Sequence, residues 1–306
     1  MSKFDKNTLP TFTQYWKPRY WPVWALIFLG WCVARLPFSW QWNIGCLLGR
    51  IMKKVSRSRR HITTRNIEVC FPHLNSEQQQ KIIDETFDNL GMGFIEIAIA
   101  YWGSQKKVDK LLAQFTGLEH FVQAQETGKG VILIVAHMIS LELCLRFFAS
   151  AQECVTMYKP AHNELFEHYS FAKRARYTIP VPNKDLRRFL RHLREGKVAL
   201  YLPDQHYGMS NSVFAPFFGV MAPTIARTDE FVRLTKCALM PVMFGRKADG
   251  YHIEVLPEFE FPTGDKVQDA TLLNQWIEKN VELYPEQYLW AHRRFKERPE
   301  GDAPIY

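Results

Sequence analysis

The sequence predicts an α/β fold, in which an open, mostly parallel sheet is flanked by helices and preceded by a helical N-terminal segment. From about residue 110, short apolar runs alternate with stretches of helical periodicity, as is typical of an open α/β sheet. The run Val131–Ala136 has no polar alternation, which is typical of a strand buried on both faces. The segment 1–60 instead concentrates tryptophan and positive charge, which indicates a separate role for it.

The expected elements follow one another along residues 110–306. Strands are predicted at Val131–Ala136, Val155–Tyr158, Val198–Leu202, Leu239–Phe244 and Tyr251–Leu256. Helices are predicted at Leu141–Ala149, Glu164–Arg176, Asp185–Glu195, Thr224–Lys236 and Gln268–Leu283. Residues 62–105 are expected to be largely helical and to brace the N-terminal segment. We therefore divide the chain into residues 1–60 and an α/β domain over residues 61–306.

The charge of the chain is distributed unevenly. The 306 residues carry +8, and residues 1–67 alone carry +11, so the remainder of the chain carries −3. A nucleic-acid-binding protein would be expected to spread basic residues over its folded surface. With 47% apolar and 23% charged residues, the chain is not a disordered protein. The uneven charge therefore favours a membrane partner over nucleic acid.

The N-terminal segment has the features of a membrane anchor. Six of the nine tryptophans lie between Trp16 and Trp42, and indole rings prefer the boundary between headgroups and acyl chains. Tyr20–Ala34 carries no charge, but as a helix it would span only about 22 Å. The basic run from Arg50 to Arg60 suits the anionic cytoplasmic leaflet. We expect one anchor, spanning or half-embedded, although a buried tryptophan-rich helix would give the same pattern.

His137 and Glu142 form the sharpest chemical motif. His137 directly follows the predicted strand Val131–Ala136, and ligands bind beyond the carboxyl ends of strands in open α/β sheets. With Ser140 as the N-cap, Glu142 would lie in the first turn of the next helix, within reach of His137. A carboxylate bonded to one imidazole nitrogen leaves the other nitrogen free to accept a proton. The alternative is a histidine held at the edge of the core.

Other catalytic motifs are absent from the sequence. It has no second histidine at zinc-site spacing, no G-x-S-x-G elbow, no Walker loop and no G-x-G-x-x-G. A histidine and an acid without an attached nucleophile suit direct transfer, in which the hydroxyl of the substrate attacks. No metal or organic cofactor is expected.

Five blocks along the chain carry a resemblance to a known family. H-x4-D/E after a buried strand is similar to the glycerolipid and lipid A acyltransferases, and the other blocks resemble the lauroyl/myristoyl transferases of late lipid A biosynthesis. These blocks are Arg65–Pro72, Met157–Pro160, Leu202–Gly208, Ser212–Gly219 and Gln287–Lys296, the last followed by Arg298-Pro299. The resemblance implies a glycerolipid-acyltransferase-like fold and an acyltransferase that acts on a lipid A precursor.

The resemblance also implies a chemistry. The donor would be an acyl carrier protein thioester, and the acceptor nucleophile would be the hydroxyl of a 3-hydroxyacyl chain on lipid IVA or Kdo-lipid IVA. His137 would act as the general base and Glu142 would orient it. A cation is expected near the thioester carbonyl or the acceptor phosphate, where the family usually has arginine and this chain has Lys159. Lysine cannot make the flat, two-pronged contact of arginine.

The remaining candidate residues would bind substrate. Asp204 and His206 follow a buried strand as His137 does, so all three could face one cleft. Arg174 could hold acceptor phosphates or could only be solvated on its helix. Arg293, in the C-terminal block, is expected to have a structural or substrate-contacting role. The arginines along 187–194 could dock the acidic carrier protein, but a charged helix face is usually only solvated.

These expectations combine into an acyltransferase at the cytoplasmic face of the bacterial inner membrane, with a lean to lauroyl transfer. A glycerophospholipid acyltransferase would use the same His/acid pair on another acceptor. A non-catalytic membrane-anchored relative would have kept the fold alone, and a hydrolase would use the histidine to activate water. Intact His137, Glu142 and Asp204 argue against the non-catalytic alternative.

Overall fold

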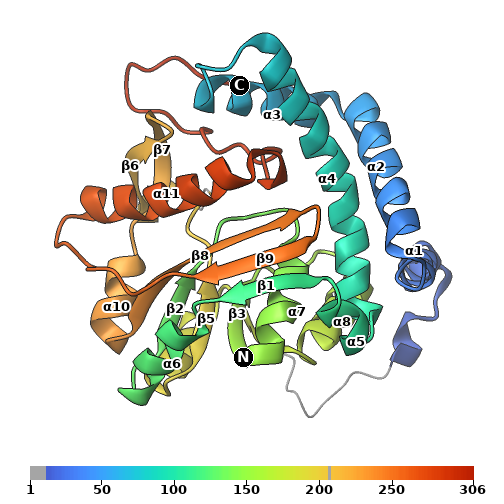
Figure 1. The fold of residues 1–306 in the computed structure, drawn as a ribbon, viewed down its shortest axis with the longest axis horizontal. Helices are drawn as coiled ribbons and strands as arrows, with labels where there is room; N and C mark the ends of the chain where they lie inside the picture. The colour runs from blue at the N-terminus through green and yellow to red at the C-terminus, as the bar shows by residue number, and fades with distance from the viewer. Residues whose placement is uncertain (1–11, 206–207) are drawn as a thin grey trace.

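A seven-stranded sheet forms the centre of the protein (Figure 1), and the computed structural model describes residues 12–205 and 208–306. The strand order is β1-β9-β8-β2-β5-β3-β4, and every pairing is parallel except that of β8 with β9. The predicted α/β fold with a mostly parallel sheet is therefore confirmed. The strands are β1 Leu112–Thr116, β2 Val131–Ile134, β3 Cys154–Tyr158, β4 Thr178–Pro182, β5 Val198–Tyr201, β8 Ala238–Lys247 and β9 Gly250–Val255.

The central strands are apolar because both of their faces are covered. Every residue of β2 and of β5 is buried, as expected for the middle of a parallel sheet with helices on its faces. α7 packs on β3, α9 on β3 and β4, and α11 on β2 and β8. The helices of this part are α5 Gln105–Asp109, α6 Leu118–Glu126, α7 Leu141–Ala151, α8 Glu164–Arg174, α9 Leu186–Arg194, α10 Thr228–Thr235 and α11 Lys266–Leu283.

The fold differs from the prediction in two ways: it contains strands that were not predicted, and one helix begins later than predicted. β4 contains Pro180 and Pro182 and lies at the edge of the sheet, where a missing backbone donor is tolerated. β1, which was not predicted either, lies at the opposite edge. The helix expected from Thr224 begins at Thr228, because residues 220–225 belong to an antiparallel hairpin. The hairpin consists of β6 Ser212–Phe217 and β7 Val220–Ile225.

The four long helices that precede the sheet in the described part of the chain include two that pack very closely. They are α1 Trp21–Val33, α2 Phe38–Val55, α3 Arg57–Cys70 and α4 Ser76–Trp102. α2 runs along α4 (Figure 1). A Cβ on Gly49 would lie 1.9 Å from the carbonyl oxygen of Phe87, and one on Gly91 would lie 2.0 Å from that of Gly45. Only glycine permits this backbone approach, so α2 is held firmly against α4. The boundary expected after residue 60 falls inside α3.

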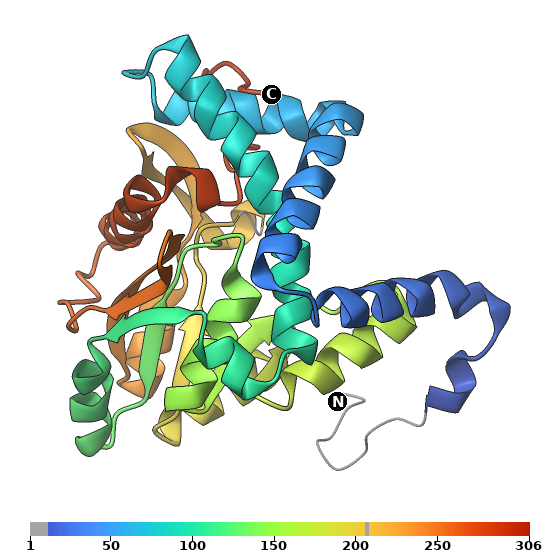
Figure 2. The same cartoon turned by 45° about the vertical axis from the view of Figure 1, so that its right-hand side comes forward.

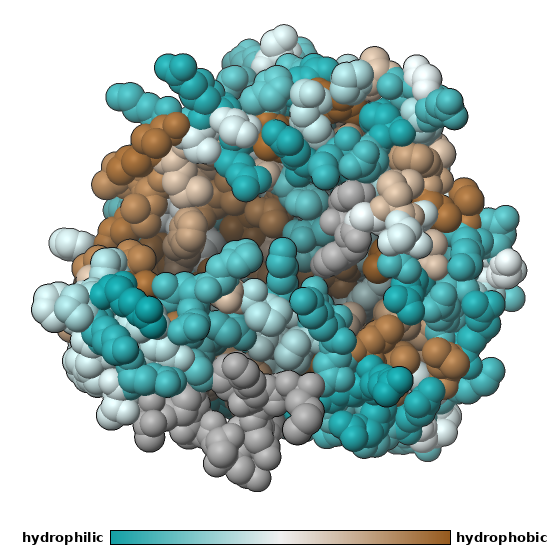
Figure 3. All heavy atoms as spheres, turned by 180° about the vertical axis from the view of Figure 1, so that it is seen from behind, coloured by the Kyte–Doolittle hydropathy of each residue, from teal (hydrophilic) through white to brown (hydrophobic). Residues whose placement is uncertain are grey.

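The outer side of the N-terminal helices exposes large apolar side chains. Figure 3 shows apolar surface over the part of the molecule where α2 lies, and Figure 2 shows the α2–α4 pair and α11 at different sides of the molecule. None of the helices in residues 12–205 and 208–306 is both long and apolar enough to cross a bilayer. The exposed apolar residues of α1 and α2 are Trp21, Leu26, Phe28, Leu29, Trp31, Trp40, Leu47, Leu48, Ile51 and Val55.

Candidate active site

The carboxyl ends of three adjacent strands meet beside one cavity. His137 comes after β2, Asp204 after β5 and Lys159 directly after β3, and these strands are neighbours in the order β2-β5-β3. The parallel direction of the strands brings all three ends to the same edge of the sheet. The structure thus brings His137 and Asp204 together at the ends of the two strands that the sequence predicted.

His137 and Asp204 form a histidine–carboxylate pair. Nδ1 of His137 lies 2.5 Å from Oδ1 of Asp204, and the backbone N–H of His137 donates to Oδ2 at 2.8 Å. The two carboxylate oxygens thus hold both the ring and the backbone of the same residue. No hydrogen bond joins Nε2 to any side chain in the described part of the chain, so this nitrogen is available at the cavity. A carboxylate on Nδ1 favours the tautomer in which Nε2 accepts a proton.

Asp204 is ionised although it is buried. Its exposed fraction is 0%, and burial alone would raise the pKa of its carboxyl group. The charge of His137, its hydrogen bonds and a hydrogen bond from the Tyr288 hydroxyl outweigh burial and hold the pKa of Asp204 below its ordinary value. Asp204, for which the sequence predicts a substrate-binding role, is bonded to His137 in the structure.

The C-terminal block holds the His137 loop in place. The N–H of Leu289 donates to the carbonyl of His137 at 3.1 Å, and the N–H of Ile139 donates to the carbonyl of Gln287 at 2.8 Å. A β-bridge between Met138 and Tyr288 lies between these two bonds. Two blocks that are far apart in the sequence thus form one backbone unit, so the position of His137 depends on the end of the chain.

Asn66 fixes the C-terminal block in turn. Its side-chain amide donates to the carbonyls of Trp290 at 2.7 Å and His292 at 2.8 Å, and its Oδ1 accepts from the Tyr306 hydroxyl at 2.5 Å. Asn66 is fully buried on α3, where unpaired amide and carbonyl groups would be costly. The Arg65–Pro72 block therefore supports the site from the helical part of the molecule.

Glu142 differs from its expected role. Its carboxylate accepts from Nε of Arg174 at 2.9 and 3.0 Å, from Nη2 at 2.5 Å, and from the Tyr177 hydroxyl at 2.6 Å. The partner of His137 is Asp204, whereas Glu142 binds the end of α8 and the residue that precedes β4. The reason is geometric: five positions along the chain rotate a helical side chain away from the preceding loop. Ser140 occupies the N-cap of α7 but its side chain makes no capping bond.

Arg174 is a partly buried cation that the Glu142 carboxylate holds in place. Nε and Nη2 are bonded to Glu142, and the side chain is 24% exposed. Burial lowers the pKa of an arginine, but the adjacent Glu142 carboxylate outweighs this effect and raises the pKa of Arg174. Burial, Glu142 and a nearby Tyr101 likewise raise the pKa of the Tyr177 hydroxyl. No hydrogen bond joins Nη1 of Arg174 to another of the described residues, so Nη1 remains for another partner.

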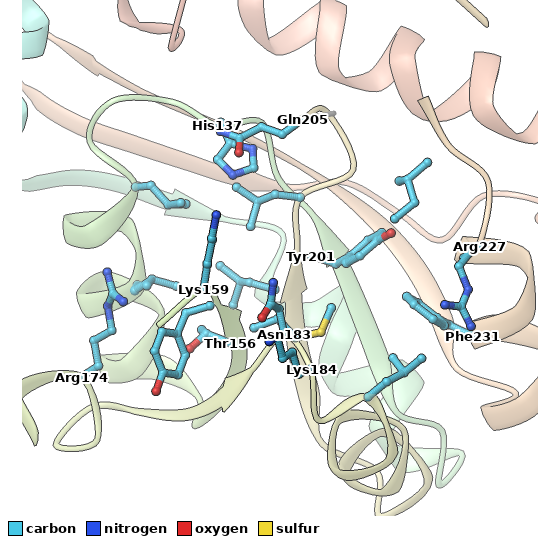
Figure 4. A pocket seen from close by; sticks show the side chains of 18 of the residues that line it. His137, Thr156, Lys159, Arg174, Asn183, Lys184, Tyr201, Gln205, Arg227 and Phe231 are labelled. Atoms are coloured by element: carbon cyan, nitrogen blue, oxygen red, sulfur yellow. The ribbon is translucent and has the colours of Figure 1, made fainter. Parts of the chain in front are cut away.

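A cavity of about 560 Å³ joins these groups. Figure 4 shows His137 and Gln205 at one side, Arg174 at another, and Tyr201 and Phe231 across from it. A volume of this size is ordinary for a ligand site. Its lining contains many apolar side chains, namely Leu141, Leu145, Met157, Leu186, Leu200, Leu202, Ile225 and Phe231.

The other predicted site residues fall into three groups. Lys159 lines the cavity, and Figure 4 shows its side chain directed toward His137. No hydrogen bond or ion pair ties Lys159 to another residue of the described ranges. Arg293 is exposed beside the ring of Tyr306 and is not among the cavity residues. His206 lies outside the described residues.

Sequence reasoning missed Tyr177 and Tyr288 as members of the site. Tyr288 belongs to the C-terminal block, so the motif marked this segment as important but did not indicate what Tyr288 does. Tyr177 stands between a helix and an edge strand, and no pattern in the sequence marks it. No group of three or more histidine, cysteine or acidic side chains that could hold a metal occurs among the residues that the structure describes.

The fold and the site define the chain as an α/β enzyme with a histidine–carboxylate pair beside a partly apolar cavity, and comparison with known proteins narrows this class. Residues 10–297 match the family described as bacterial lipid A biosynthesis acyltransferase. The chain belongs to this family and is an acyltransferase.

Curated relatives cover nearly the whole chain. A lipid A biosynthesis lauroyltransferase of Escherichia coli (strain K12) is 34% identical over 306 residues, covering 98% of this chain and 100% of the relative. A palmitoleoyltransferase of the same organism is 35% identical over 298 residues, with 96% and 97% covered. A myristoyltransferase from that organism is 25% identical over 312 residues, with 99% and 96% covered.

Proposed function

We propose that the protein transfers a lauroyl (or myristoyl) chain from acyl carrier protein to the hydroxyl of a 3-hydroxyacyl chain on a lipid IVA or Kdo-lipid IVA precursor. The observation that carries the proposal is the imidazole of His137, whose Nδ1 is bonded to Asp204 and whose Nε2 is left for the cavity. The family membership supports the lipid A precursor as the acceptor.

The reaction needs one base and no enzyme-bound intermediate. Nε2 of His137 takes the proton of the acceptor hydroxyl while its oxygen attacks the thioester carbonyl. The tetrahedral intermediate collapses with cleavage of the carbon–sulfur bond, and His137 returns the proton to the leaving thiolate. The buried Asp204 carboxylate stabilises the imidazolium that forms between these steps.

Lys159 and Arg174 are proposed to interact with negatively charged groups of the intermediate and of the acceptor. The Lys159 ammonium group faces His137 across the cavity, so it is suited to stabilise the negative oxygen of the intermediate. As a compact point charge it can do this without the two-pronged geometry of arginine. Glu142 holds Arg174, so that Nη1 can contact the acceptor.

The acyl chain is proposed to occupy the apolar part of the cavity. Leu186, Leu200, Ile225 and Phe231 supply apolar walls there, and burial of each methylene contributes about 0.8 kcal/mol. The relatives named for lauroyl and palmitoleoyl transfer are equally similar to this chain, so the lauroyl chain remains the proposal and the two longer donors belong in its test.

The N-terminal helices are proposed to hold the protein at the cytoplasmic face of the inner membrane. The exposed apolar side chains of α1 and α2 would enter the headgroup boundary, and the basic residues from Arg50 to Arg60 would contact anionic lipids. This is the half-embedded form of the expected anchor. Extraction of membranes with carbonate should retain the protein, and Trp40→Ser/Leu47→Ser/Ile51→Ser should release a large part of it.

The test of the reaction uses membrane fractions, lauroyl, myristoyl and palmitoleoyl carrier-protein donors, and a lipid A precursor with glycerol phosphate as the control acceptor. Wild type should add the mass of one acyl chain to the lipid A precursor, and His137→Ala should lose this activity by at least about 10³-fold. Acylation of glycerol phosphate alone would move the protein to glycerophospholipid synthesis. No transfer to either acceptor by folded protein would refute the proposal.

A further inference from the structure

Helix α9 presents a stripe of arginines to solvent. Arg187, Arg191 and Arg194 are exposed, and their spacing of four and three residues places them on one face of the helix. The opposite face is buried through Phe189 and Leu193. Burial of one face holds the helix in place and turns the arginines outward.

These arginines lack the carboxylate partners that a number of other surface cations have. No ion pair joins Arg187, Arg191 or Arg194 to an acid among residues 12–205 and 208–306, and Glu195 is bonded to His192. Exposed and half-exposed cations elsewhere are commonly paired, as in Arg50–Asp88, Lys53–Asp84, Arg65–Glu68, Lys197–Glu153, Arg227–Glu230 and Arg233–Asp229. The stripe is therefore an uncompensated positive surface.

The net charge of the segment that carries the stripe is opposite in sign to that of the surrounding domain. Residues 184–197 contain six lysines and arginines and two acids, a net +4, whereas residues 68–306 as a whole carry −3. The rest of that region therefore carries −7. A local positive surface on an otherwise acidic body gives a directed field for an acidic partner.

The N-terminal end of α9 borders the catalytic cavity. Asn183, Lys184 and Leu186 line it together with His137, and Figure 4 shows Asn183 and Lys184 on the far side of Lys159 from His137. A partner bound along the stripe would therefore stand beside this cavity.

We propose that the arginine stripe of α9 is the docking surface for an acidic carrier protein that delivers the acyl thioester; this rests on the proposed function. A membrane is the weaker fit, because interfacial helices need large apolar side chains beside their cations. Among the residues that the structure describes, no large apolar residue of α9 is strongly exposed. α9 packs on β3, β4 and α10, whereas the apolar surface of α2 belongs to the pair with α4.

The test measures binding directly, without requiring catalysis. Fluorescence anisotropy of labelled lauroyl carrier protein would be recorded with the full chain as wild type, as Arg187→Ala/Arg191→Ala, and as the control Lys106→Ala/Lys110→Ala. The control removes the same charge from exposed positions at α5. The stripe variant should raise Kd about tenfold at low salt and less at high salt, and the control should match wild type.

A second readout separates docking from damage to the cavity. Turnover of lauroyl pantetheine, which lacks the protein part of the donor, should be the same in the stripe variant and in wild type. Unchanged carrier-protein binding in the variant would overturn the docking surface, as would absent binding in wild type. So would a loss of binding to anionic vesicles with carrier-protein binding retained. Stripe-dependent binding without transfer to a lipid A precursor would refute the proposed function and leave the docking surface standing.

Discussion

Two carboxylates beside the same cavity are used in different ways. Asp204 is fully buried, and its carboxylate holds both the ring and the backbone N–H of His137. Glu142 is 7% exposed and is bonded to Arg174, which stays protonated, and to Tyr177. The His137–Asp204 pair leaves Nε2 of His137 open to the cavity, whereas the Glu142–Arg174 pair lines the cavity.

The difference shows that strand order selects the partner of His137, whereas closeness in sequence does not. Glu142 is near His137 in the sequence and binds a side chain 32 residues further on. Asp204 is 67 residues away and reaches His137 because β2 and β5 are adjacent. Substitutions in the two pairs can test whether the His137–Asp204 pair is catalytic, as proposed, and the Glu142–Arg174 pair structural.

Asp204→Asn should give the largest effect on catalysis. The amide keeps the shape of the side chain but no longer stabilises the imidazolium or fixes the tautomer of His137, so kcat should fall about 10³-fold with little change in KM. Steady-state kinetics on the lipid A precursor would measure this loss. A fall of less than tenfold would show that Asp204 is not the functional partner of His137.

Glu142→Gln should act mainly on stability. The substitution leaves the partly buried Arg174 without its counter-charge, which should lower the free energy of unfolding by about 3 kcal/mol, while kcat falls much less than in Asp204→Asn. Urea denaturation of the variant, of Arg174→Met and of the double variant gives the coupling energy between the two residues. Additive effects, or a kcat loss equal to that of Asp204→Asn, would contradict the separation of the two pairs.

The depressed pKa of Asp204 predicts a stability difference that depends on pH. Because the folded-state pKa lies below the ordinary value of about 3.9, this carboxylate stabilises the protein above that pH. Its contribution is lost as the pH falls through the folded-state pKa. The difference in the free energy of unfolding between wild type and Asp204→Asn should therefore shrink below about pH 4, which denaturation at a series of pH values would show. A difference that grew toward acid pH would have the wrong sign.

Tyr288→Phe should give the smallest effect. It removes the hydroxyl that helps to hold the pKa of Asp204 low and leaves the backbone bridge to Met138 intact. A loss of about 1 kcal/mol in stability and a less than tenfold fall in kcat are expected. The matched change Tyr284→Phe, on a residue outside this network, should leave kcat unchanged.

Much of the sheet could be predicted because its central strands are short, wholly apolar runs. β2, β5, β8 and β9 lie where periodicity placed them. β4 was missed because its two prolines argue against a strand, and proline is compatible with an edge position that only the assembled sheet reveals. The β6–β7 hairpin was missed as well: both of its strands contain proline, and the predicted helix from Thr224 overlapped its second strand.

The site could be predicted where it follows from strand ends and not where it depends on long-range contacts. His137 and Asp204 each come after a buried strand, so their meeting follows from the topology. The pairing of Glu142 with Arg174 requires α7 and α8 to be placed relative to each other, which no local pattern gives. The same holds for Asn66 and the C-terminal block.

The backbone bonds between the His137 loop and Gln287–Leu289 also set an order of events during synthesis. A ribosome releases α1 and α2 first and the C-terminal block last. The loop that carries the proposed base, His137, can be fixed in place only after synthesis has passed Leu289. The protein can therefore reach the proposed membrane surface before it is able to catalyse transfer. Chains that end before Gln287 should bind to the membrane but should not turn over substrate.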